Sequence, residues 1–271
     1  MHASIIFASA LFASAYAAPA YPALNMDAAM PGSITVMSEY FNMLARKVQE
    51  QRAMSQTPVC DLSMAQLPTV PGSKNPMPPP SAGLALKHIA LGRGTQNYTC
   101  DAGNATAAPV AAGALATLFN ASCVGSYFPQ LLNQLSKVTI LFNLTGEELD
   151  QKIAPSNLAI SGHHYFTPDA TVPFFDLDVP GQQLGRVSVG KNASEPAPAD
   201  APRGQQGEAA VAWLKLTAKP GMATGELQEV YRVGTAGGSP PATCKDMPAK
   251  FEVQYTAQYW FYAGKPSEKK N

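Results

Sequence analysis

The segment that most constrains the fold is the closing stretch, residues 251–263, which reads FEVQYTAQYWFYA. Its side chains alternate, and one set is apolar: Phe251, Val253, Tyr255, Ala257, Tyr259 and Phe261. The other set begins with polar residues: Glu252, Gln254, Thr256 and Gln258. This two-residue period predicts a β-strand with one buried face, because successive side chains of a strand point to opposite sides. A shift of one residue would bury Glu252 and Gln254, so the register is strongly specified.

Other segments also read as strands. Residues 84–100 suggest two strand halves around a bend at Gly92 and Gly94. Residues 210–217 and 226–233 fit a hairpin with a longer loop at 220–225. Residues 138–144 are also strand-like, and residues 180–203 read as a loop rich in Gly, Pro and Ala.

Helices are expected to be few. Residues 129–137 begin with a proline and predict a short helix. In residues 33–54, Ile34, Met37, Phe41, Leu44 and Val48 recur at steps of three and four, which predicts an amphipathic helix that packs on the domain. The predicted class is therefore all-β, a mainly antiparallel sandwich or barrel, with an N-terminal packing helix and a few short helices.

The chain divides into segments by composition. Residues 1–17 contain a short apolar run followed by Ala15-Tyr16-Ala17, which is typical of a secretory signal peptide. An N-terminal segment with the helix follows at 18–56, and a proline-rich connection at 57–83 can hold neither helix nor inner strand. The β-rich domain is expected at 84–264, with a polar tail at 265–271.

Three further features agree with export. Five N-x-[ST] sequons are present, at Asn97, Asn104, Asn120, Asn143 and Asn192, where chance predicts about one or two. Four widely spaced cysteines, Cys60, Cys100, Cys123 and Cys244, suit two disulfides better than a compact zinc site, and they allow three pairings. Lys plus Arg equals Asp plus Glu at 19 each, so no basic patch for nucleic acid is expected, nor does any later stretch resemble a membrane span.

Catalytic motifs are missing from the sequence. It contains no H-E-x-x-H and no G-x-S-x-G, so we predict no bound cofactor and assign no metal ligands. The best candidate for a small catalytic or metal-binding group is His88 and His164 together with one carboxylate, Asp169 or Asp176. The alternative is that one histidine is a hydrogen-bonded residue of the core, since imidazole readily fills such positions.

Aromatic residues offer a second candidate. Trp260 and Tyr262 fall on the face of the closing strand that begins polar, so they could stack on sugar rings. The alternative is that a loop or the 33–54 helix covers them. Trp213 is open to the same two interpretations.

Several motifs together resemble one family, the secreted fungal and bacterial proteins of domain of unknown function 3455, and its fungal branch in particular. The motifs are Gly92–Cys100, Gly162–Phe166, Ala212–Leu216, Tyr231–Cys244 and Tyr255–Tyr262. The resemblance covers about residues 60–263 and implies a strand at 114–119, where alanine content alone favours helix. It also implies that Cys100 pairs with Cys244 and Cys60 with Cys123.

The resemblance implies little about function. Some fungal relatives carry a malate dehydrogenase label, which no G-x-G-x-x-G supports here. We expect an exported glycoprotein, extracellular or wall-associated, with a non-catalytic binding or structural role and a wall or host glycan as partner. The alternative is a secreted enzyme acting on a substrate such as polysaccharide, through His164 with a metal or carboxylate partner.

Overall fold

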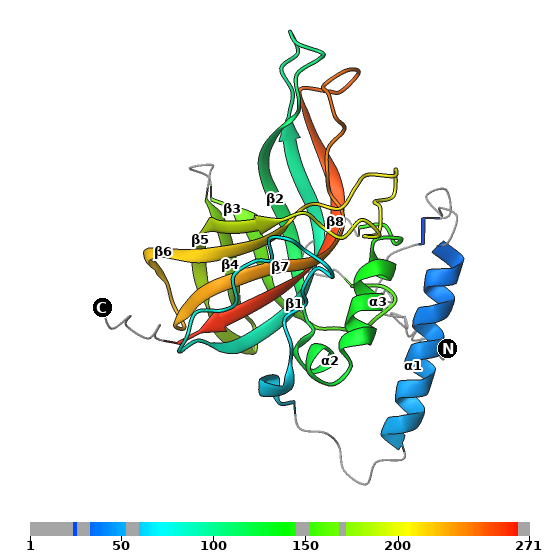
Figure 1. Ribbon diagram of the computed structural model, residues 1–271, viewed down its shortest axis with the longest axis vertical. Coiled ribbons are helices and arrows are strands. Elements are labelled where there is room, and N and C mark those ends of the chain that lie inside the picture. Colours follow the sequence, from blue (N-terminus) through cyan, green and yellow to red (C-terminus); the bar gives the residue numbers. More distant parts are fainter. Residues whose placement is uncertain (1–23, 26–32, 53–59, 145–151, 168–171, 265–271) are drawn as a thin grey trace, which may run out of the picture.

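The computed structural model describes residues 24–25, 33–52, 60–144, 152–167 and 172–264 (Figure 1). The predicted signal peptide, Asp169 and the polar tail lie outside these ranges. None of the helices in the described ranges is long and apolar enough to cross a membrane.

Within the described residues, eight strands form one closed antiparallel barrel in which each strand pairs with the next along the chain and β8 pairs back with β1. The strands are β1 Ala85–Thr99, β2 Val110–Asn120, β3 Ile160–Phe166, β4 Pro173–Val179, β5 Gln182–Glu195, β6 Trp213–Ala223, β7 Leu227–Gly237 and β8 Lys250–Ala263. The all-β antiparallel prediction is confirmed, and of its two forms the barrel is the one observed. Closure leaves no unpaired sheet edge along the wall.

In the part of the chain that the structure describes, the helices are few, as predicted. They are α1 Ser33–Arg52, α2 Ser122–Tyr127, α3 Pro129–Thr139 and a 3-10 turn, η1 Leu62–Met64. Figure 1 shows α2 and α3 against one side of the barrel and α1 outside α3. The other side of the barrel carries no described helix in this view.

The lumen of the barrel is filled by side chains, and β8 supplies much of the filling. Tyr255, Ala257, Tyr259 and Phe261 are buried there together with Phe175 of β4, as the alternation predicted. The Tyr255 and Tyr259 hydroxyls lie 2.8 Å apart, which satisfies two polar groups inside an apolar core. At Gly94 the neighbouring strand comes so close that a Cβ would collide with the Leu115 carbonyl oxygen. That crossing therefore admits only glycine.

A second apolar layer lies outside the barrel, between β1, β7 and β8 and the helices. Leu132, Leu135 and Val138 of α3 pack there on Trp260 of β8. The buried Arg93 guanidinium donates to the carbonyl oxygens of Thr139 (3.3 Å) and Phe142 (2.9 Å) at the end of α3. Burial lowers the pKa of Arg93 to about 9. A cation at a helix C-terminus offsets the helix dipole, so Arg93 anchors α3 to the barrel.

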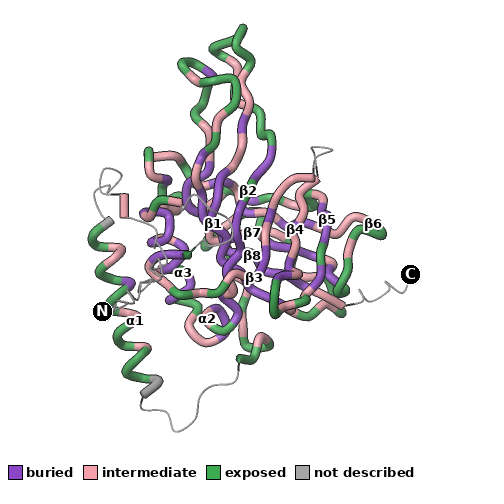
Figure 2. Tube along the Cα trace, turned by 180° about the vertical axis from the view of Figure 1, so that it is seen from behind, coloured by how far each residue is buried: buried purple, intermediate pink, exposed green. Residues whose placement is uncertain are grey.

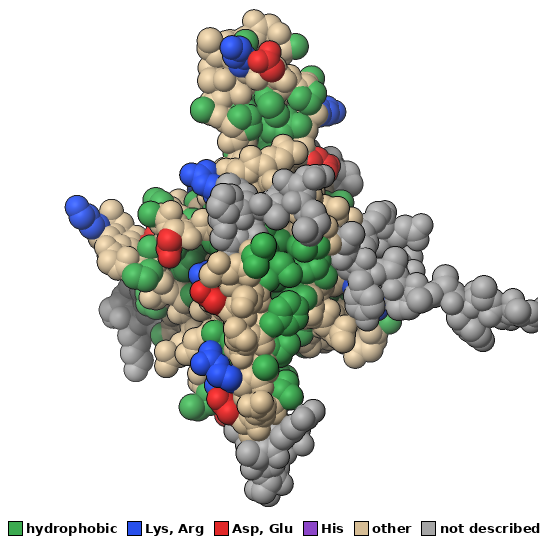
Figure 3. Space-filling model, turned by 90° about the vertical axis from the view of Figure 1, so that its right-hand side faces the viewer, with side chains coloured by type: hydrophobic (Ala, Val, Ile, Leu, Met, Phe, Trp, Pro, Cys, Tyr) green, Lys and Arg blue, Asp and Glu red, His purple; other side chains and the backbone are tan. Residues whose placement is uncertain are grey.

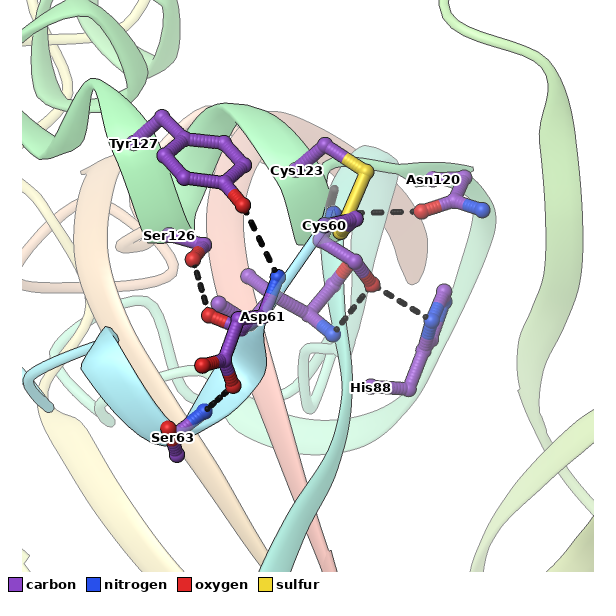
Figure 4. Close-up of a disulfide and its surroundings, with 10 residues drawn as sticks. Cys60, Asp61, Ser63, His88, Asn120, Cys123, Ser126 and Tyr127 are labelled. Atoms are coloured by element: carbon purple, nitrogen blue, oxygen red, sulfur yellow. Dashed lines mark hydrogen bonds between the residues drawn. A yellow bond between two sulfur atoms is a disulfide. The ribbon is translucent and has the colours of Figure 1, made fainter. Parts of the chain in front are cut away.

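Both disulfides are those that the family resemblance implied. Cys60 pairs with Cys123 at the start of α2, and Cys100 pairs with Cys244 near the tips of β1 and β8, with Cα separations of 5.0 and 5.5 Å. Figure 4 shows the first, where the Asp61 N–H donates to the Tyr127 hydroxyl (3.2 Å). Two disulfides are typical of an oxidising compartment.

The proline-rich connection runs along the barrel wall as a strap, which we define as residues 60–83. Its far end is held by a buried ion pair between Lys215 and Glu229 (3.0 Å), whose side chains are 5% and 6% exposed. Lys215 also donates to the Pro79 carbonyl (2.8 Å), and the Ser81 hydroxyl donates to Glu229 (2.6 Å). The strap is therefore fixed by side chains of β6 and β7, since its prolines lack N–H groups and offer only carbonyl oxygens as acceptors.

Helix α1 confirms the predicted N-terminal helix but not its predicted inner face. Tyr40 is buried against α3 and the outer apolar layer, whereas Ile34 is 80% exposed, Phe41 46% and Val48 39%. The helix is rotated relative to the expected orientation, because its aromatic contact with the domain is made through Tyr40 rather than Phe41.

Two other expectations are wrong. Residues 180–203 do not form one loop, since β5 occupies Gln182–Glu195 and buries Val187 and Val189 in the lumen. Residues 138–144 do not form a strand, because α3 continues to Thr139 and the chain then turns. The predicted hairpin is confirmed as β6 and β7, with residues 220–223 inside β6.

Candidate functional site

His88 is part of the packing between β1 and α2. Its Nε2 lies 2.9 Å from the Ser161 hydroxyl and its Nδ1 lies 2.9 Å from the Ser122 hydroxyl, so both ring nitrogens are occupied. Burial lowers the pKa of His88 to about 4. The ring is therefore neutral at physiological pH and held by two hydroxyls.

His164 lies in the barrel lumen. Its ring stacks on Phe175, with centroids 4.1 Å apart and planes 9° from parallel. Its Nδ1 lies 2.9 Å from the Phe174 carbonyl oxygen. Desolvation lowers the pKa of His164 to about 4, with a smaller contribution from the positive charge of Arg232. Its neighbour His163 lies on the other face of β3 and pairs in register with Asp176.

The predicted constellation is not assembled with Asp176. Asp176 lies on the outer face of β4, where its carboxylate is 3.0 Å from Nε of Arg186, while His164 faces the lumen. Asp169 lies outside the described residues. Among the residues that are described, no group of three or more His, Cys, Asp or Glu side chains could hold a metal ion.

The predicted exposed platform on β8 is also wrong. Trp260 is 1% exposed, and its indole N–H donates to Gln258 Oε1 (3.2 Å). Tyr262 is buried in the same outer apolar layer, where its ring meets Tyr231 edge-on. Trp260 and Tyr262 are core residues, because α3 and the strap cover the outer face of β8, on which the first residues of the strand are polar.

The sequon asparagines differ in exposure. Asn104, Asn143 and Asn192 are exposed, as an attached glycan requires. Asn120 is half-buried, and its side-chain oxygen accepts from the Ser122 N–H (3.1 Å) at the start of α2. Asn97 is half-buried within β1, where its side-chain oxygen accepts from Thr95. Glycosylation at all five stays a prediction, and the first three positions suit it best.

A different site is built around Trp213, at the start of β6. A hollow of about 260 Å³ lies between the strap, α3, β7, β8 and the loop after β5, and we call it the Trp213 hollow. Its apolar lining combines the indole with prolines of the strap and loop, including Pro68, Pro71, Pro198 and Pro202. Its polar lining combines amides, hydroxyls and charges: Asn133, Gln258, Thr69, Thr235, Lys137 and Asp200.

The hydrogen bonding of this hollow is incomplete. Gln258 Nε2 donates to Asn133 Oδ1 (2.9 Å) and to the Ser136 hydroxyl (3.2 Å), so this amide is held rigidly. The Trp213 indole is 5% exposed, and its N–H has no acceptor among the described residues. A buried donor without a partner costs about 1–3 kcal/mol. Five other buried polar atoms of the described residues are in the same state, so this feature is not particular to the hollow.

A second hollow, of about 510 Å³, lies on the other side of the same loop and shares Pro198 and Ala201 with the first. Glu195, which pairs in register with Trp213, lines it and is 3% exposed. One Glu195 oxygen accepts from the Met77 N–H (3.4 Å), and the other has no donor among the described residues. An unpaired donor and an unpaired acceptor thus lie on neighbouring strands beneath one loop.

Sequence reasoning considered Trp213 but did not find this site. Its lining comes from segments near residues 68, 133, 200, 213, 235 and 258, which no motif links. The sequence feature that points toward this site is a tryptophan that has proline-rich segments on both sides of it along the chain. That feature does not predict which segments meet.

The fold and the covalent structure define a class: a disulfide-bonded, eight-stranded antiparallel barrel with an outer layer of short helices and a proline strap. The chain belongs to the family described as protein of unknown function DUF3455, whose profile matches residues 80–263. No curated protein and no solved structure matches the sequence significantly. The strap up to residue 79 and α1 lie outside the matched range.

Proposed function

We propose that the protein is an exported, glycosylated binding protein, extracellular or wall-associated, that takes a small carbohydrate unit in the Trp213 hollow. The observation that carries the proposal is the lining of that hollow, where an indole and prolines stand beside amide, hydroxyl and charged side chains. A sugar ring needs both kinds of surface, because its C–H face packs on aromatic rings while its hydroxyls form hydrogen bonds.

The size and the polar lining of the hollow agree with this ligand class. A hollow of 260 Å³ lies just below the range of about 300–1,000 Å³ that holds drug-sized ligands, which suits one small polar molecule. A hydroxyl is both a donor and an acceptor, so sugar hydroxyls would match the amide, hydroxyl and charged side chains that line the hollow.

Export is supported by independent features. The two disulfides, the exposed sequons and the signal-like residues 1–17 are all typical of the secretory route. The enzyme alternative depends on His164, which is buried and stacked on Phe175, while the Asp176 carboxylate lies on the outer face of β4 against Arg186. This placement favours binding over catalysis.

The test is a glycan array followed by calorimetry on the glycosylated secreted protein. Trp213→Phe keeps an aromatic ring but removes the N–H, and Lys137→Ala shortens a side chain that lines the hollow. Each should weaken binding about tenfold, equal to about 1.4 kcal/mol. The melting temperature should be unchanged in Lys137→Ala, whereas Trp213→Phe should lower it because Trp213 belongs to the outer apolar layer.

Lys191→Ala is the matched control, because Lys191 is exposed on β5 and does not line the hollow. It should leave binding unchanged. If the wild type binds no glycan, or binds one with equal affinity in all three variants, the proposal is wrong.

A further inference from the structure

An apolar stripe on α1 stays uncovered by the rest of the described chain. Ile34, Phe41 and Val48 are 80%, 46% and 39% exposed. They recur every seven residues, so they lie in one line along the helix. Figure 3, which views the side of the molecule on which α1 lies, shows hydrophobic side chains gathered in a continuous column there.

The spacing is that of a coiled-coil seam. Met37 and Leu44 fall between the three stripe residues, and the steps 34, 37, 41, 44 and 48 alternate between three and four. Both are half-buried at the edge of the outer apolar layer, so they join the stripe to the core of the domain. The domain therefore packs against only one edge of this apolar seam, and a second helix would pack against the exposed remainder.

Charge is absent from the stripe and from its solvent-exposed border. Ser38 and Ala45 lie there with small side chains, followed by the uncharged exposed residues Thr35, Asn42 and Gln49. Lys47 borders the seam on the side that faces the domain, where its Nζ lies 5.6 Å from the Phe128 ring centroid, and Glu39, Arg46 and Glu50 lie on other sides of the helix. Depletion of charge is typical of the centre of a protein interface. Helices that bind anionic membranes instead carry Lys and Arg on their polar face.

We infer that α1 is a self-association surface, on which α1 of a second copy of this chain packs in a symmetric dimer. A stripe with heptad spacing is self-complementary, because the same knobs and holes occur on both helices. Small residues at 38 and 45 allow two such helices to approach closely. Helix α1 is already held by Tyr40 and α3, so pairing does not require it to fold first.

The test is the mass of the secreted protein in solution, measured by sedimentation velocity and light scattering over a wide concentration range. The wild type should form a dimer that dissociates on dilution. Phe41→Glu places a charge in the middle of the seam, and it should shift the protein to monomer at every concentration. Phe41 is 46% exposed, so the melting temperature should stay close to that of the wild type.

Arg46→Gln is the matched control, because it changes the net charge by the same single unit on a different side of α1. It should leave the dimer intact. A wild type that is monomeric throughout would overturn the inference. A dimer that survives Phe41→Glu, or one that Arg46→Gln also dissociates, would overturn it as well.

Discussion

The two sides of the barrel wall differ in what lies outside them. The covered wall consists of β1, β7 and β8 beneath α2, α3 and the strap, and the open wall consists of β4 and β5 (Figure 2). On β8 every side chain from Tyr255 to Tyr262 is buried, whichever way it points. On β4 only the lumen-facing Phe175, Leu177 and Val179 are buried. The side chains that a strand buries in the lumen follow from its own sequence. Whether its outward-facing side chains are buried depends on which elements pack against them.

The walls also differ in how polar groups are paired. On the covered side, Lys215 and Glu229 form an ion pair that solvent hardly reaches. On the open side, Arg186 meets Asp176 with its side chain 53% exposed. The covered wall should therefore dominate stability, and four measurements test that expectation in decreasing order of effect.

The largest effect is expected from Trp260→Ala. Removing a fully buried indole leaves a cavity between β8 and α3, which should cost about 3–5 kcal/mol of unfolding free energy. Phe174→Ala on the outer face of the open wall is the matched variant, and it should cost less than half as much because Phe174 is half-buried. Urea denaturation measures both. Equal losses of unfolding free energy in the two variants would contradict the expected difference in stability between the covered and the open wall.

A smaller effect is expected from the paired change Cys60→Ser and Cys123→Ser. It releases the strap from α2 and should cost about 2–4 kcal/mol, while the strap becomes sensitive to protease. The same change at Cys100 and Cys244 is the comparison, since that bridge ties the tips of β1 and β8. It should leave the strap protected. Cleavage of the strap at equal rates in both variants would contradict this assignment.

The third prediction concerns acid. His88 and His164 each have a pKa lowered to about 4, against 6.5 in an unfolded chain. The unfolded state therefore binds more protons between these values, so stability falls as the pH drops from about 6.5 to about 4. Each histidine accounts for up to about 3 kcal/mol.

His164→Phe removes one of these two contributions and keeps a ring against Phe175. The difference in unfolding free energy between pH 7 and pH 4.5 should then become smaller than in the wild type. An unchanged difference would show that His164 is solvated and would weaken the view of a closed lumen.

The smallest effect is expected from Arg186→Ala on the open wall. Exposed ion pairs contribute little to stability because solvent and salt screen them. The melting temperature should therefore be close to that of the wild type in differential scanning calorimetry, at low and high salt alike. A clear loss would mean that the open wall depends on its surface charges.

Much of the barrel could be predicted because the information is local. Alternation along residues 251–263 determined the strand and its lumen-facing side chains, since side-chain direction in a strand follows directly from position. The hairpin of β6 and β7 was likewise readable from two apolar runs around a turn. Strand β5 was missed because Gly and Pro near residues 180–203 suggested a loop, although Val187 and Val189 fill the lumen.

The candidate site could not be predicted in the same way. His88 and His164 were identified as residues of interest, but their separation, and the outward direction of Asp176, depend on which strands become neighbours. The Trp213 hollow joins segments up to 190 positions apart, from Pro68 to Gln258. No pattern within a single segment predicts contacts between segments that are so distant along the chain.

The sequence by itself determined β1, β6, β7 and β8, the lumen face of β8 and the presence of four cysteines suited to two disulfides. Only the tertiary structure decided that the sheet closes, that α3 and the strap bury Trp260, and that α1 turns Tyr40 inward and leaves Phe41 outside. The reason is physical: a strand's period is a property of its own backbone, whereas burial of an outer face is the outcome of packing between elements that are distant along the chain.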